Sequence, residues 1–185
     1  MFPRNEFPQR AKMQIHQLQL IYQPEDDRVL FRLSTSERAE FRFWLTRRCV
    51  KLLWQALLKM LERDRVLATQ FDPQARREVL GMQHEGYVSK GDFTRGFDSA
   101  PAALPLGENP LLVTKFRTSE KPDGVQILSL YPTQGQGADI ALDTRLLHIL
   151  CKMLRDAVAK SDWDMVLQLA HEVEAVPEQQ KQKLN

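Results

Sequence analysis

Residues 41–61, FRFWLTRRCVKLLWQALLKML, contain the pattern that decides the fold of this chain. In the first five residues, Phe41, Phe43 and Leu45 alternate with Arg42 and Trp44, which is the period of a half-buried strand. We therefore expect residues 41–45 to form a strand with one buried face.

The rest of the stretch predicts a long helix that begins after Thr46, whose hydroxyl can accept a hydrogen bond from an N–H of the first turn. Polar residues fall on one narrow stripe at helical spacing, and nearly every other position is apolar. An ordinary surface helix buries about a third of its circumference, so we expect this helix to be covered on more than one side. The solvent stripe consists of Arg48, Lys51, Gln55, Lys59 and Glu62.

The same pattern returns ninety-seven positions later, where residues 140–145 align with residues 43–48. Chance similarity of two strand–helix units is one explanation. We favour an internal duplication, because a repeat of this length is typical of duplicated structural units. Residues 41–45 and 138–142 are then strands in corresponding positions of two superposable halves. The second solvent stripe consists of Arg145, His148, Lys152, Asp156 and Ala159.

The strand and turn signals around the two stretches predict an α+β fold of two βββα units related by an internal pseudo-twofold, with antiparallel sheets packed against long apolar helices. The expected first unit covers residues 13–65, with strands at 13–22, 28–34 and 41–45. The expected second unit covers residues 111–163, with strands at 111–117, 125–131 and 138–142, a helix from 144 to about 160, and Trp163 as an anchor.

Three segments lie outside the two units, and together with them we expect one compact domain. Residues 1–12 are expected to be a disordered arm, and residues 164–185 a polar tail with a short helix at 165–173. Residues 66–110 are expected to hold a helix from 73 to 90, capped by Asp72, and a Gly/Pro-rich connector. Val79, Leu80, Met82 and Tyr87 are its expected contact side, and Phe93, Phe97 and Leu104 are expected to pin the connector to the body.

The composition, 43% apolar and 27% charged, is that of an ordinary globular protein. No apolar run approaches the roughly twenty residues of a membrane span, and the first residues do not read as a secretory signal. Cys49 and Cys151 each lie in an apolar helix pattern, which predicts buried free thiols and a cytoplasmic location. The net charge of +2 hides a basic first unit, since residues 1–65 hold thirteen Lys/Arg against eight Asp/Glu.

The sequence contains no pattern that indicates catalysis, a cofactor or a metal. No two histidines have a metal-ligand spacing, and neither cysteine has a neighbouring His or a glycine-rich turn. We expect surface or half-buried histidines at His16, His84, His148 and His171. A catalytic carboxylate pair in the connector is the weakest of the functions considered.

The outward face of the first sheet is the candidate binding face. Basic side chains interleaved with an aromatic ring can bind phosphates and stack on bases, as a single-stranded nucleic-acid platform requires. The alternative, which we favour, is that the connector, the second unit or a partner subunit covers the ring. The face consists of Arg28, Leu30, Arg32, Arg42 and Trp44, beside Gln17 and Gln19.

Two resemblances bear on the function. Strand trios each followed by a long helix resemble the layout of PUR-repeat and Whirly-type proteins, which bind single-stranded nucleic acid. Those families have four strands per repeat where three are expected here, and no binding residue carries over. The strings DRVLFRL (27–33), FWLTRR (43–48) and LLW (52–54) resemble an uncharacterised bacterial family over residues 13–163, which implies a bacterial cytosolic protein without supplying an activity.

We therefore expect a non-enzymatic protein-interaction or scaffolding module, with another protein or a second copy of itself as partner and no membrane contact. Single-stranded nucleic-acid binding through the face around Trp44 is the alternative.

Overall fold

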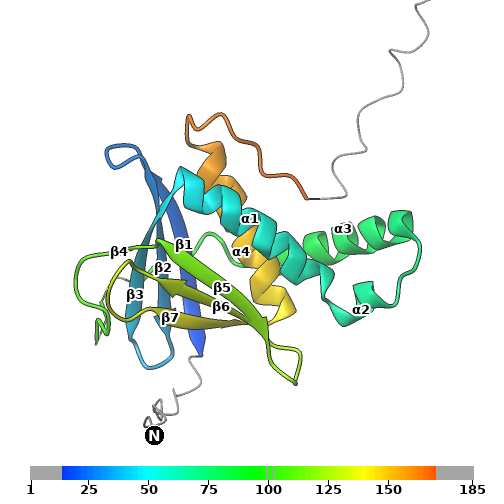
Figure 1. The fold of residues 1–185 in the computed structure, drawn as a ribbon, viewed down its shortest axis with the longest axis horizontal. Coiled ribbons are helices and arrows are strands. Elements are labelled where there is room, and N and C mark those ends of the chain that lie inside the picture. The colour runs from blue at the N-terminus through cyan, green and yellow to red at the C-terminus, as the bar shows by residue number, and fades with distance from the viewer. Residues whose placement is uncertain (1–13, 99, 102, 170–185) are drawn as a thin grey trace, which may run out of the picture.

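The computed structural model describes residues 14–98, 100–101 and 103–169 and shows a mixed α+β fold (Figure 1). The described residues form two sheets and four helices. The first sheet has the order β1 (Ile15–Gln23), β2 (Arg28–Thr35), β3 (Glu40–Thr46), β4 (Leu111–Leu112), and the second has the order β5 (Lys115–Glu120), β6 (Gln126–Tyr131), β7 (Ala138–Leu142). The helices are α1 (Arg47–Glu62), α2 (Arg65–Ala68), α3 (Pro73–Ser89) and α4 (Thr144–Ala159).

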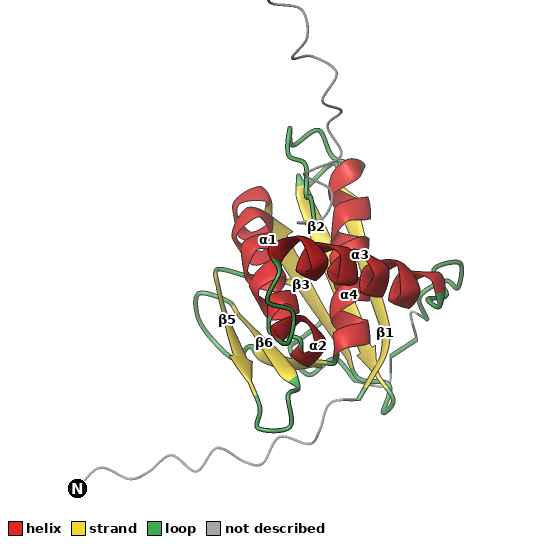
Figure 2. Ribbon diagram, turned by 90° about the vertical axis from the view of Figure 1, so that its right-hand side faces the viewer, coloured by secondary structure: helices red, strands yellow, loops and turns green. Residues whose placement is uncertain are grey.

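The predicted alternation of the strands is confirmed, because their apolar positions face a single core. Phe31 and Phe43 lie opposite each other in the β2–β3 register, with ring centroids 6.1 Å apart, and both are buried. The long helices α1 and α4 pack against each other and the strands, while α3 lies across α4 (Figure 2).

The starts of both long helices follow from their capping residues. The Cys49 N–H donates to the hydroxyl of Thr46 at 3.2 Å, and the Leu146 N–H donates to the carboxylate of Asp143 at 2.7 Å. The predicted solvent stripe of α1 is exposed. Leu52 is 51% exposed, so α1 is an amphipathic helix and the expected cover on more than one side is wrong at this position.

The strand predicted at residues 111–117 is broken in the middle, and the break changes the sheet count. The Val113 N–H donates to the carbonyl of Trp44, and the Thr114 N–H donates to the carbonyl of Tyr131, each at 3.0 Å. The chain therefore leaves the first sheet after β4, which is parallel to β3, and enters the second sheet as β5. The first sheet has four strands for this reason, and not the expected three.

Helix α3 begins at Pro73 with Asp72 as its cap, as predicted, and Val79, Leu80 and Tyr87 of the predicted contact side do pack inward, so the prediction is wrong only for Met82. Met82 is 72% exposed, whereas Leu80, Gly81 and His84 are buried. Residues 80, 84 and 87 are three or four positions apart, so they lie on one face of α3, and His84 and Tyr87 of this face contact His148 of α4.

The chain after α4 returns to the first hairpin. Trp163 is 2% exposed, its ring meets that of Tyr22 edge-on at a centroid distance of 5.5 Å, and its indole N–H donates to Asp27. The anchor predicted at Trp163 is therefore in place, while the helix predicted at 165–173 is wrong over residues 165–169. The predicted N-terminal arm, His171 and the rest of the tail lie outside the described residues. No helix in the described ranges has the length and apolar character needed to cross a membrane.

Candidate functional site

The strand register brings the five residues of the predicted binding face together. Leu30 lies opposite Trp44, and Arg32 lies opposite Arg42, while Arg28 is at the start of β2. All five side chains are half-buried.

A buried carboxylate that the sequence analysis did not single out lies beside the two central arginines. Glu40 is 1% exposed, and its Oε1 accepts hydrogen bonds from Arg32 Nε at 2.8 Å and from Arg42 Nε at 2.7 Å. Burial acts to raise the pKa of Glu40, but the hydrogen bonds from Arg42 and Arg32 outweigh it, so the pKa is lowered. The sequence did contain a signal for this position. Glu40, Arg42 and Trp44 are two positions apart in one strand, so their side chains point to the same face of the sheet.

The connector covers part of this face. The guanidinium of Arg32 lies 4.2 Å from the ring centroid of Phe97, and Arg42 Nη1 donates to the carbonyl of Glu108 at 2.9 Å. The favoured alternative expected cover over the ring of Trp44 with the arginines left at the rim, but these connector contacts are made by the two arginines. An apolar row remains across the four strands, formed in register by Ile21, Leu30, Trp44 and Leu112, whose end members are 39% and 38% exposed.

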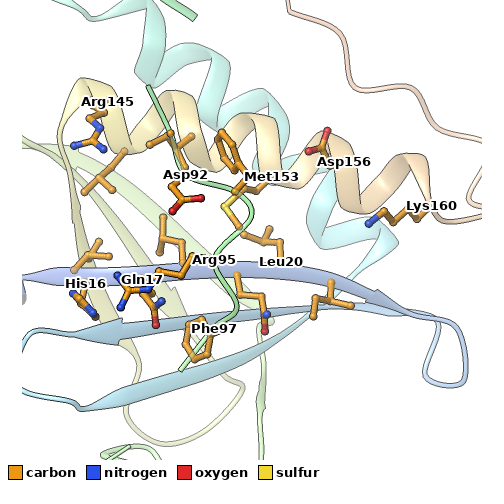
Figure 3. Close-up of a pocket in the computed structure, with 18 residues that line it drawn as sticks. His16, Gln17, Leu20, Asp92, Arg95, Phe97, Arg145, Met153, Asp156 and Lys160 are labelled. Atoms are coloured by element: carbon orange, nitrogen blue, oxygen red, sulfur yellow. The ribbon is translucent and has the colours of Figure 1, made fainter. Parts of the chain in front are cut away.

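A cleft of about 520 Å³ lies at the β1 edge of the first sheet, between β1, the connector and α4 (Figure 3). Residues 15–21 of β1 form one side, residues 91–97 contribute a second, and one face of α4 forms the third. The three segments are far apart in the chain, so no local pattern could reveal the cleft.

The cleft combines an apolar middle with a charged rim. Leu146, Ile149 and Met153 of α4 face Leu18 and Leu20 of β1 across it. The rim carries Asp92, Arg95, Arg145, Asp156 and Lys160.

The two rim carboxylates already have partners. Asp156 pairs with Lys152 one turn away on α4. Asp92 accepts hydrogen bonds from the hydroxyl and the backbone N–H of Thr94, at 2.8 and 3.0 Å, and these bonds hold its pKa below the ordinary value. Of the three rim cations, Arg95 lies near enough to Asp92 to help lower the pKa of that carboxyl, whereas Arg145 and Lys160 form no ion pair with another residue in the described ranges, so these two cations remain for a ligand.

The connector spans the cleft from α4 to the outward face of the sheet. Near α4, the ammonium of Lys152 lies 4.9 Å from the ring centroid of Phe93. Beside β1, Gln17 Nε2 donates to the carbonyl of Gly96 at 3.3 Å, and the Asp98 N–H donates to Gln17 Oε1 at 3.0 Å. The connector is thus held at both sides of the cleft by side-chain contacts.

A second polar cluster is buried where α3 meets α4. His84 Nδ1 and His148 Nδ1 are 3.1 Å apart, and the ring of Tyr87 stacks on His148 with centroids 5.2 Å apart. His148 was expected on the solvent stripe of α4, but it is 0% exposed because α3 covers it. Burial, with the neighbouring His84, lowers the pKa of His148 to about 4, although Asp64 acts in the opposite direction. The expectation of exposed or half-buried histidines is therefore wrong for this pair, whose members are 64 residues apart in sequence.

The two cysteines are buried free thiols, as predicted. Burial raises the pKa of Cys49 to about 11 and that of Cys151 to about 12, so both are protonated near neutral pH and are poor nucleophiles. No group of three or more His, Cys, Asp and Glu side chains within the described residues is arranged to hold a metal ion.

Comparison of the chain with protein-family models, with curated proteins and with solved structures gives no match. The function is therefore proposed from the geometry of the surface.

Proposed function

We propose that the chain is a non-enzymatic protein-interaction module that holds a segment of a partner protein in the cleft between β1, the connector and α4. The observation that carries this proposal is the composition of the cleft, with apolar side chains in the middle and two cations at the rim that have no ion-pair partner among the described residues. Its volume of about 520 Å³ lies within the usual range for ligand sites.

Each part of the cleft has a separate role in such binding. Burial of apolar partner side chains against Ile149 and Met153 supplies affinity, at roughly 25 cal/mol per Å² removed from water. Arg145 and Lys160 favour an acidic partner and speed its approach. The partner is either another protein or a second copy of the chain.

A displayed library of random peptides, selected on the immobilised full chain, tests the proposal. Selected peptides should bind the chain and the Met82→Glu variant equally, because Met82 is exposed on α3 and does not line the cleft. Ile149→Glu places a charge in the apolar middle and should weaken binding at least about tenfold. Selection of no peptide, or of peptides indifferent to Ile149→Glu, would refute the proposal.

Single-stranded nucleic-acid binding is the second candidate, favoured by the register that sets Arg32 and Arg42 beside Trp44 and Leu30. Because Glu40 bonds to both arginines, a phosphate would compete with this carboxylate. Three phosphate contacts, including Arg28, imply a log–log salt slope of roughly −2. Fluorescence anisotropy with labelled single-stranded DNA and RNA at several salt concentrations measures that slope, and no binding at low salt would end this candidate.

We also infer that the two βββα units arose by internal duplication. The inference is supported by the repeated order, β1–β2–β3–α1 and β5–β6–β7–α4, and by caps at the aligned positions Thr46 and Asp143. Superposition of residues 15–62 on 115–159 tests it, and halves that cannot be overlaid would end the inference. We place the protein in the cytosol, supported by the two buried thiols; mass spectrometry of the natural protein without reductant should find both free.

A further inference from the structure

The side of the cleft formed by β1 consists of seven consecutive residues, 15–21. The pairing of β1 with β2 is irregular between Ile15 and Gln17. From Gln17 to Ile21 successive side chains point to opposite faces of the sheet, so a cleft lined by all of them follows the edge of the strand. β1 is an outer strand of the first sheet, and no strand within the described residues pairs with its second edge. The N–H and C=O groups along such an edge are a template for another strand.

The opposite side of the cleft has the length of a strand. Arg145, Ile149, Met153, Asp156 and Lys160 lie three or four positions apart and form one stripe along α4. At a rise of 1.5 Å per residue this stripe is about 22 Å long. Seven residues of β1 span roughly 23 Å. The cleft can therefore accept an extended segment along its whole length.

Among the described residues, the connector forms no backbone hydrogen bond with residues 15–21. Its hydrogen bonds to β1 are made with the side chain of Gln17, through Gly96 and Asp98, and not with the backbone of the strand. Residues 18–21 lie beyond this contact and still line the cleft. They are where we place the pairing.

The charges of the rim indicate what should flank the pairing segment. Arg145 lies at the start of α4, and Lys160 follows its last residue, so a cation is present at each end of the helical side. Asp156 and Asp92 are engaged by Lys152 and Thr94. Acidic residues at the two ends of a bound segment are therefore complementary to the rim.

From these observations we propose that β1 binds an extended, acid-flanked segment of a partner protein as an added strand at the edge of the first sheet. Apolar residues of that segment alternate toward Leu146, Ile149 and Met153. The inference rests on the proposed function, since it specifies the form of the segment that the cleft holds.

The test uses the full chain and a fluorescein-labelled peptide, Asp-Thr-Val-Thr-Val-Thr-Val-Asp with an amidated C-terminus, followed by anisotropy. Two further peptides carry N-methyl groups on the three Val amides or on the three Thr amides. In an added strand only alternate amides face β1, so one N-methylated peptide should bind like the parent and the other should lose about tenfold to a hundredfold in affinity. Equal loss in both, no loss in either, or no binding of the parent overturns strand addition.

This comparison uses the unmodified protein, so it does not depend on the folding of a variant. It also separates the two proposals, because library-selected peptides that respond to Ile149→Glu but show no alternation would keep the interaction module and reject the added strand. A peptide with Lys in place of both Asp residues should bind less tightly than the parent, with the gap closing at high salt.

Two other occupants of the edge are distinguished in the same assay. A dimer, measured by analytical ultracentrifugation, that the peptide dissociates would assign the edge to a second copy and overturn the proposal. Peptide binding that begins only after removal of residues 1–13 would assign the edge to the chain's own N-terminal segment and also overturn it. A full chain that remains monomeric and binds the peptide supports the proposal.

Discussion

Lowering the pH from about 7 to about 5 is expected to destabilise the fold through His148, which is buried in contact with a second histidine, His84. Its ring is fully buried between α4 and α3, where it faces His84 and Tyr87, with Asp64 nearby after α1. Burial and the adjacent His84 lower the pKa of His148 to about 4, whereas an unfolded histidine titrates near 6.5. The folded state therefore keeps this ring neutral while the unfolded state binds a proton.

The sign and size of the effect follow from these two pKa values. Above about pH 6.5 both states hold a neutral His148, so the residue adds no pH dependence. Below it, each pH unit lowers the free energy of unfolding by about 1.4 kcal/mol until the folded ring titrates near pH 4. The loss at pH 5 is then about 2 kcal/mol. Carboxylates whose pKa is lowered in the fold, such as Glu40 and Asp64, lose their contribution only below about pH 4.5, outside this window.

Urea denaturation followed by tryptophan fluorescence at several pH values measures this loss, since Trp54 and Trp163 are both buried. His148→Leu should remove most of the pH dependence, because a leucine cannot take up the proton. His16→Leu, on the exposed part of β1, is the matched control and should keep the dependence. A wild-type stability that stays level from pH 7 to 5, or an unchanged slope in His148→Leu, would contradict the assigned burial of the neutral ring.

Three further outcomes are expected. Trp163→Ala should lower the free energy of unfolding by about 3–5 kcal/mol, because a buried ring that contacts Tyr22 and Asp27 is lost. The control Val166→Ala, at an 80% exposed position, should change it by less than about 0.5 kcal/mol. Equal effects of the two substitutions in urea denaturation would show that Trp163 is not an anchor. Glu40→Gln should lower the free energy of unfolding by about 3 kcal/mol in the same assay, because Arg32 and Arg42 lose their shared carboxylate. A variant as stable as the parent would mean that water solvates the two arginines and Glu40. Cys49 and Cys151 should react with a thiol reagent at about pH 8 only after urea is added, and rapid labelling of the native chain would contradict their burial and raised pKa values.

Local periodicity was enough to predict most elements of the fold. The alternation of Phe41, Phe43 and Leu45 and the capping hydroxyl of Thr46 are properties of neighbouring residues, so they hold whatever the rest of the chain does. The break at Val113 was not predictable, because it depends on the carbonyl of Trp44 being within reach of the Val113 N–H. A strand pattern does not reveal which sheet its residues will join.

The candidate site was less accessible to sequence reasoning than the fold. Strand parity correctly grouped Arg32, Arg42 and Trp44, but parity alone does not show that Glu40 is buried beside them or that Phe97 lies over Arg32. His148 appeared polar on a helical stripe, and only the docking of α3 makes it a core residue. The cleft combines a strand edge, a connector and a helix face, and the sequence specifies each of them without specifying that they meet.

The bond between the Trp163 indole and Asp27 has a consequence for synthesis of the chain. Its two residues are 136 positions apart, and Trp54 on α1 similarly donates to the carbonyl of Gln168 at 3.3 Å. At about 5–20 residues per second, a ribosome needs on the order of ten seconds to add that much chain. During that interval the nascent first hairpin and α1 leave the tunnel with tryptophan and tyrosine surfaces still open to water. The core around Trp163 can close only after residue 163 has been synthesised, so a chaperone acting on the growing chain would meet the first hairpin and α1 with these aromatic rings uncovered.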